Sequence, residues 1–183
     1  MLVHSPTIYD DICPGNIFLD TTVFINCSDS SEFLEFIKSL SDKDCLLWTI
    51  PSVKFEFARY ANTINEYNEF INFIKDLGVT VFNRIEEIVL DKSDAFTVAL
   101  NKAQSNNKKR MSYTDAVLCS LAFKHRSSAG YIMTSNHNDI PPALYDRKEI
   151  ITFEISGHIR NEALYQLWLD CVLASILLRS IIS

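Results

Sequence analysis

The sequence lacks the features that mark a secreted protein or one that coats nucleic acid. Its formal net charge is −6, whereas bulk attraction to phosphates rests on an excess of Lys and Arg. The opening segment MLVHSPTIYDD has acids where a signal peptide would be apolar. We therefore predict a cytoplasmic protein whose contacts with nucleic acid, if it makes any, are local.

The cysteines also lack a recognisable pattern. They are five in number, widely spaced and without a Cys-x-x-Cys pair, so the sequence suggests neither a disulfide framework nor a zinc knuckle. A reducing cytoplasm fits this usage best. The positions are Cys13, Cys27, Cys45, Cys119 and Cys171.

The longest apolar run, residues 163–182, is interrupted by charge. It carries Asp170 near its middle and Arg179 close to its end. A charge within a membrane-spanning helix costs roughly 2.5–3.5 kcal/mol on insertion scales. We expect no membrane span, and we predict that residues 158–183 form an apolar C-terminal helix that packs on the core or on a partner.

The rest of the chain is predicted to form one α/β domain over residues 1–157, with its core at about 16–154. Its 183 residues are 48% hydrophobic, enough for one sizeable core, and no repeat divides it. Short apolar runs alternate with helical patterns, which is typical of strand-helix units. We predict a three-layer α/β/α fold with a central, mainly parallel sheet of about five strands. The expected strands are 17–20, 45–50, 79–82, 131–134 and 149–153, and the expected helices are 31–40, one opening at Pro51, 67–77, 91–104 and 112–123.

Four acidic residues lie just past strand ends or near helix starts. They are Asp20 in IFLDTTVFI, Glu56 in PSVKFEFAR, Asp115 in SYTDAVLCSLA and Asp139 in TSNHNDIPP. In parallel sheets ligands bind outside the carboxyl ends of the strands, where distant residues can converge. Gathered there, these carboxylates would form an oxygen cage for a divalent cation.

Each acid also has an ordinary explanation. Asp20 is suited to cap a helix that starts at Thr21, and Asp115 fits a capping box. Glu56 could pair with Arg59 on a helix surface, and Asp139 could belong to a turn. None of these explanations accounts for the joint arrangement.

The segments LDTTVFI, SVKFEFAR, SYTDAVLCSLA and TSNHNDIP, in this order, resemble the four motifs of the PIN domain. This family of metal-dependent nucleases includes VapC-type toxins. The resemblance implies a Mg²⁺ or Mn²⁺ cofactor, an RNA substrate and, for a toxin, an antitoxin protein; homodimers are common in the family. It implies catalytic and metal-binding roles for Asp20, Glu56, Asp115 and Asp139.

In this interpretation Asp20, Asp115 and Asp139 bind the first metal, and Glu56 positions water or completes a weaker second site. Three further residues, Thr21, Thr134 and Asn136, would orient the ligands and the water. Asn136 stands where the family often has an acid, and its neutral carbonyl binds a hard cation less strongly than a carboxylate does.

Basic residues near these motifs are candidates for contacts with RNA phosphates. One group precedes the Asp115 helix or flanks Glu56, and a second group follows that helix. The first comprises Lys54, Arg59, Lys108, Lys109 and Arg110, and the second comprises Lys124, His125 and Arg126.

Two other functions remain open at this point. One is a PIN-like module that binds RNA or protein but has little or no activity, which Asn136 would favour. The other is a phosphatase of the haloacid dehalogenase type, because Asp20 follows an apolar strand as that family's nucleophile does. That family's usual second aspartate is Thr22 here.

Overall fold

A computed structural model describes residues 2–59, 61–86, 89–90, 93–94, 97, 111–128, 130–140, 142 and 144–167. The chain begins with α1 (Ile8–Ile12), β1 (Asn16–Leu19), α2 (Thr21–Asp29), α3 (Ser31–Asp42) and β2 (Leu46–Thr49). It continues with α4 (Pro51–Ala58), α5 (Ile64–Asp76), β3 (Thr80–Val81) and α7 (Tyr113–Lys124). The last elements are the short 3₁₀ helix η1 (Arg126–Ser128), β4 (Gly130–Thr134), β5 (Tyr145–Ile155) and β6 (His158–Leu167).

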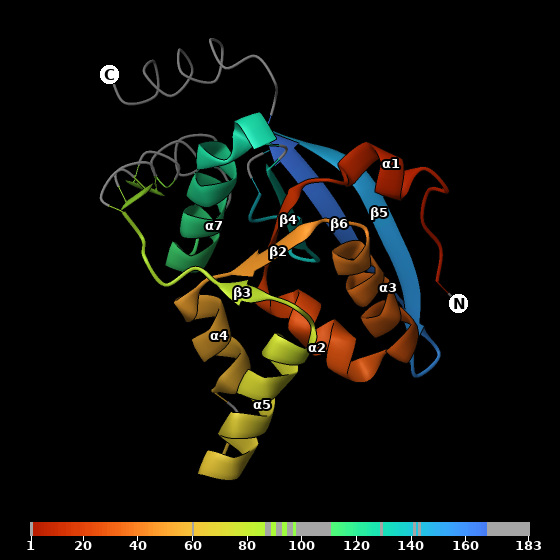
Figure 1. Ribbon diagram of the computed structural model, residues 1–183, viewed down its shortest axis with the longest axis vertical. Coiled ribbons are helices and arrows are strands. Elements are labelled where there is room, and N and C mark those ends of the chain that lie inside the picture. Colours follow the sequence, from red (N-terminus) through yellow and green to blue (C-terminus); the bar gives the residue numbers. More distant parts are fainter. Residues whose placement is uncertain are drawn as a thin grey trace.

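The strands form one six-stranded sheet in the order β3-β2-β1-β4-β6-β5 (Figure 1). Strands β1, β2, β3 and β4 pair in parallel, as the sequence predicts. Strand β6 pairs antiparallel with both β4 and β5, and β5 and β6 are the longest strands of the sheet. The α/β class is therefore confirmed, but the sheet is mixed and the prediction of a mainly parallel sheet is wrong.

The prediction of a C-terminal helix is wrong for the part of residues 158–183 that the structure describes. Residues 158–167 form β6, which joins β5 through the two-residue turn Ser156-Gly157. Both turn residues have positive φ, at 50° and 80°, and this suits a tight hairpin. The remainder of that segment, residues 168–183, lies outside the described residues, as does most of the helix expected at 91–104. Within the described part of the chain, no helix is long and apolar enough to cross a membrane.

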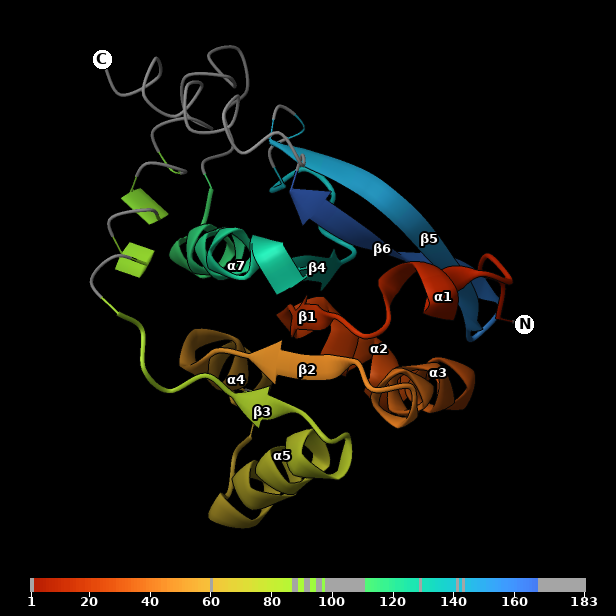
Figure 2. The same cartoon turned by 45° about the horizontal axis from the view of Figure 1, so that its top comes forward.

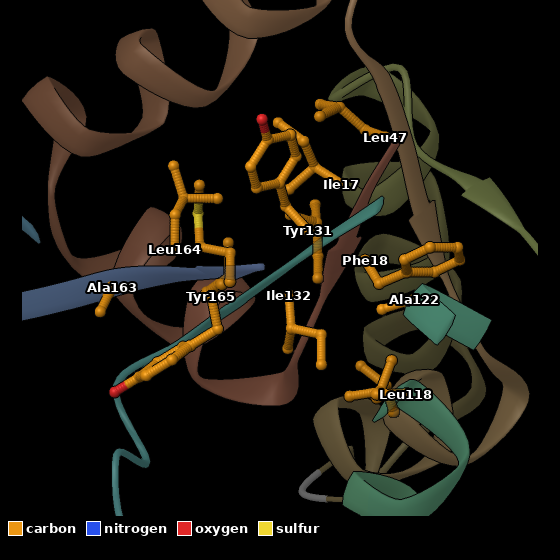
Figure 3. Close-up of a cluster of buried hydrophobic side chains, with 14 of the residues drawn as sticks. Ile17, Phe18, Leu47, Leu118, Ala122, Tyr131, Ile132, Ala163, Leu164 and Tyr165 are labelled. Carbon is orange, nitrogen blue, oxygen red and sulfur yellow. The ribbon is translucent and has the colours of Figure 1, made fainter. Parts of the chain in front are cut away.

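Helix α7 packs on one face of the sheet. Strand register places Phe18 of β1 beside Ile132 of β4, and both are fully buried. Leu118 and Ala122 of α7 lie against this pair (Figure 3). Nearly every residue of α7 is buried, because the helix fills the space over the centre of the sheet.

Helices α1 and α3 pack on the opposite face. The Tyr131 hydroxyl of β4 donates a hydrogen bond to the Asp11 carbonyl of α1, at 3.1 Å. The Phe33 ring of α3 stacks on Phe153 of β5 with 4.3 Å between ring centroids. Figure 2 shows the long β5–β6 hairpin beside α1, with β3 and α5 at the other edge of the sheet.

A disulfide joins Cys13 to Cys45. The prediction that the cysteines form no disulfide is therefore wrong for this pair. The two residues are 32 positions apart, and a separation of this size does not by itself indicate pairing. Cys13 lies shortly before β1, Cys45 lies directly before β2, and these two strands are parallel neighbours. Cys27 and Cys119 are free and buried.

Candidate functional site

Asp20 caps α2, as the sequence predicts, and also contacts β4. Its side chain accepts hydrogen bonds from the Thr21 amide at 2.6 Å and from the Thr134 hydroxyl at 2.7 Å. Burial raises the pKa of Asp20, against the lowering effect of these bonds, and the nearby charge of Glu56 adds to the rise. Asp20 directly follows β1 and bonds to Thr134, the last residue of β4, so it lies at the carboxyl ends of two neighbouring parallel strands.

Glu56 connects three helices. Its two carboxylate oxygens accept hydrogen bonds from Thr21 of α2 at 2.7 Å and from Thr114 of α7 at 2.8 Å. Pro51 opens α4 directly after β2, as predicted, so Glu56 lies near the carboxyl end of that strand. These bonds place Glu56 among the other acids rather than on an open surface.

Asp115 lies in the first turn of α7, where the sequence predicts a cap. The Ser112 hydroxyl caps the helix by accepting from the Asp115 amide at 3.1 Å, and it also bonds to the Asp115 carboxylate. Burial raises the pKa of Asp115 to about 7, and the charges of Asp20 and Asp139 contribute to that rise. Asp115 therefore lies within electrostatic range of Asp20 and Asp139.

Asp139 follows β4 in a turn, again as the sequence allows. The side-chain amide of Asn136 donates to the Asp139 carboxylate, and the Asn136 backbone amide donates to the Thr134 hydroxyl at 2.9 Å. Thr134 itself donates to Asp20. A continuous chain of hydrogen bonds therefore runs from Asp20 through Thr134 and Asn136 to Asp139.

The structure thus brings all four predicted acids to one edge of the sheet, but their oxygens are engaged by hydroxyl and amide donors. Within the residues that the structure describes, no group of three or more His, Cys, Asp or Glu side chains is arranged to hold a metal ion. The carboxylates are close enough to influence one another's charge and are not preformed into a ligand cage.

Searches against protein-family models, curated proteins and solved structures find no match for this chain.

The donor chemistry of the site fits a hard divalent cation. In the described part of the chain, no Lys or Arg forms a salt bridge with Asp20, Glu56 or Asp115. Buried carboxylates without a positive partner normally shift their pKa upward or bind a metal ion, and the first of these effects is present. A bound cation would supply positive charge beside these carboxylates and relieve their mutual repulsion.

The predicted supporting residues fall into distinct positions. Thr21 and Thr134 bond directly to the acids, and Asn136 bonds to Asp139. Lys54 lies on α4 with Glu56, and Arg59 is the residue that directly follows this helix. The other predicted phosphate contacts, Lys108, Lys109 and Arg110, lie outside the described residues.

The alternative basic group lies at the wrong end of α7. Lys124 and His125 are at the carboxyl end of the helix, which has twelve residues and is roughly 18 Å long. Lys124 pairs with Glu86, and Arg126 donates to the Phe123 carbonyl. These residues are far from Asp115 at the helix start.

Glu162 of β6 is a fifth acid near the site that the sequence analysis missed. It is fully buried, and its Oε1 accepts a hydrogen bond from Asn26 of α2 at 2.6 Å. Burial raises its pKa to about 8, and the charge of Asp20 adds to the rise. Its Oε2 has no hydrogen-bond partner of ordinary geometry. The nearby hydroxyls of Thr22 and Ser135 favour the ionised carboxylate and lower the pKa of Glu162 in part. The Ser-Gly turn before β6 is the sequence signal that could have placed it on a strand.

Proposed function

We propose that this protein is a PIN-type, metal-dependent endoribonuclease. The observation that carries the proposal is a set of three buried acids with coupled charges, Asp20, Asp115 and Asp139. Among the residues that the structure describes, no Lys or Arg forms a salt bridge with Asp20 or Asp115. Four motifs in PIN order supply these residues, and the carboxyl ends of β1 and β4 position Asp20 and Asp139. Acid clusters of this kind are costly unless a cation is bound.

The residues have separate roles in the proposed site. Asp20, Asp115 and Asp139 would hold one Mg²⁺ or Mn²⁺ ion. When bound, such an ion acidifies a water molecule and neutralises charge on the phosphate. Asp20 is held in place by Thr134, so its carboxylate cannot rotate freely toward solvent.

Glu56 would orient the attacking water and accept its proton. The hydroxyls of Thr21 and Thr114 fix both of its oxygens in position. A carboxylate held by two hydroxyl donors keeps its orientation without a positive partner, and it remains available as a general base. Asn136 would hold Asp139 and add little to cation binding itself.

The test is cleavage of a mixed single-stranded RNA pool by the purified full chain with Mn²⁺. We expect the parent to cut RNA and both Asp20→Asn and Asp115→Asn to lose at least about a hundredfold in rate, as removal of a group central to catalysis does. Glu35→Gln is the matched control, because Glu35 is an exposed acid of α3 that pairs with Lys38. Equal cutting by all four proteins would mean that a contaminant is responsible and would refute the proposal.

A second candidate is a PIN-like module that binds RNA without cutting it. The specific observation in its favour is that Asn136 stands where an acid is common and is already committed to Asp139. RNA binding by the parent without cleavage in Mn²⁺ or Mg²⁺ would select this function. An antitoxin partner and a homodimer stay predictions of the family resemblance.

A further inference from the structure

A pocket of about 510 Å³ opens beside the acid site. Its walls come from α2, from the segment after β4 and from the turn end of the β5–β6 hairpin. Thr22 and Ser135 form its boundary with the acids. The Thr22 hydroxyl accepts from the Ser135 amide at 3.1 Å and lies 3.4 Å from the Asp20 carboxylate. A ligand in this pocket would therefore lie one side chain away from Asp20.

Two amide side chains give the pocket one acceptor and one donor. The amide nitrogen of Asn26 is bonded to buried Glu162, which leaves its carbonyl oxygen as an acceptor. The carbonyl oxygen of Asn161 accepts from Thr152 at 2.8 Å, which leaves its amide nitrogen as a donor. Paired donors and acceptors of this kind recognise the edges of nucleobases.

The remaining lining suits the other parts of a nucleotide. Ile25 and Ile159 are 40% and 62% exposed, and they offer apolar surface to the face of a base. Arg160 is exposed and forms no side-chain hydrogen bond or salt bridge with another described residue, so its guanidinium is available to a phosphate. Asp29 of α2 also lines the pocket, and its carboxylate can accept hydrogen bonds from hydroxyl or amino groups of a ligand.

We infer that this pocket holds one ribonucleotide of the RNA substrate, adjacent to the phosphodiester bond that is cut. The inference rests on the proposed function, because it names a substrate contact beside the same acids. The volume is in the range of small-ligand sites, and the lining combines apolar, amide and cationic groups within it. Glu162 acts as a positioning residue by fixing Asn26.

Binding is tested with a fluorescent pool of single-stranded RNA octamers in the presence of EDTA, which removes the cation that the proposed cleavage requires. We expect Arg160→Gln to weaken binding roughly tenfold, the loss typical of one charge-assisted contact. Lys148→Gln is the matched control, because Lys148 is an exposed cation of β5 at the far end of the hairpin and pairs with Asp146. It should bind within about twofold of the parent.

Sequencing of cleavage products from a random RNA pool provides the second measurement. The parent should prefer certain nucleotides beside the cut, and Asn161→Ser should flatten that preference while cutting continues. If the parent cuts RNA but both variants keep its affinity and its preference, the pocket inference is overturned and the nuclease proposal stands. If the parent cuts nothing but Arg160→Gln still weakens binding, the nuclease proposal fails and the pocket is supported as an RNA subsite.

Discussion

Hydroxyl side chains determine the geometry of the acids at the scale of single residues. Thr21, Thr114 and Thr134 each donate a hydrogen bond to a carboxylate, and each comes from a different helix or strand. Such bonds to charged acceptors contribute about 1.5–3 kcal/mol when buried. They fix the orientations of the Glu56 and Asp20 carboxylates.

The buried acid Glu162 gives a prediction for pH dependence. Its pKa is raised from 4.5 to about 8, so the folded protein keeps a proton that the unfolded chain has lost. Its contribution to stability is therefore greatest below pH 4.5 and is lost as the pH rises toward 8. Glu162→Gln retains an acceptor for Asn26 and has no charge to bury. Its free energy of unfolding should therefore rise by about a few kcal/mol relative to the parent across this pH window.

Urea unfolding at pH 5, 7 and 9 measures this difference. We expect the free energy of unfolding of the variant, relative to the parent, to rise with pH. Glu35→Gln should show no comparable trend, because Glu35 is exposed. A difference that is flat with pH would mean that Glu162 ionises normally in the folded protein.

The residue-scale predictions from sequence succeeded where the signal was local. Capping by Asp20 and Ser112 follows from short-range chemistry, and both caps are present. Glu56 was open to a pairing with Arg59, and the structure instead bonds it to hydroxyls of α2 and α7. That choice depends on residues 35 and 58 positions away, which no local pattern reveals.

At the scale of elements, the contact between α7 and β4 depends on a residue without a side chain. Gly130 begins β4, and a Cβ at this position would lie 2.6 Å from the Ala122 carbonyl oxygen of α7. Backbone cannot yield as a flexible side chain can. The start of β4 must therefore be glycine if α7 is to pack this closely on the sheet.

Gly130→Ala should consequently lower the free energy of unfolding by about 1–3 kcal/mol, the usual cost of overpacking. Gly157→Ala is the matched control, because a Cβ there meets open space and the only cost is the strain of its positive φ, roughly 1–2 kcal/mol. Thermal unfolding of the two variants provides the comparison. Equal stability of Gly130→Ala and the parent would show that α7 sits farther from β4 than described.

The elements predicted correctly are those with clear periodicity and boundary residues. The helix at Ser31–Asp42 has apolar residues at helical spacing, and Pro51 marks the start of α4. The β5–β6 hairpin was missed because the largely apolar residues from Ala163 onward fit a buried helix as well as a buried strand. Antiparallel pairing with β4 decides between them, and this is a tertiary effect.

At the scale of the whole molecule, the Cys13–Cys45 disulfide joins the segments that precede the neighbouring strands β1 and β2. A bond that closes a loop with a sequence separation of 32 stabilises the fold by about 3–4 kcal/mol in the chain-entropy model. We therefore expect Cys13→Ser with Cys45→Ser to lower the free energy of unfolding by about that amount. Urea unfolding under non-reducing conditions measures it.

Thiol labelling provides the control for this prediction. In urea without reductant, Cys27 and Cys119 should react with an alkylating reagent, whereas Cys13 and Cys45 should react only after reduction. Labelling of Cys13 and Cys45 without reduction would contradict the disulfide. The cytoplasmic location stays a prediction in either case.

The central claim is that Asp20, Asp115 and Asp139 bind one divalent cation at the carboxyl edge of the parallel strands. The most direct measurement is calorimetric titration of the metal-free full chain with Mn²⁺, beside Asp115→Asn and the exposed control Glu35→Gln. We predict binding by the parent and the control, with affinity at least about tenfold weaker in Asp115→Asn. Equal Mn²⁺ affinity in all three proteins, or no binding by the parent, would contradict the account.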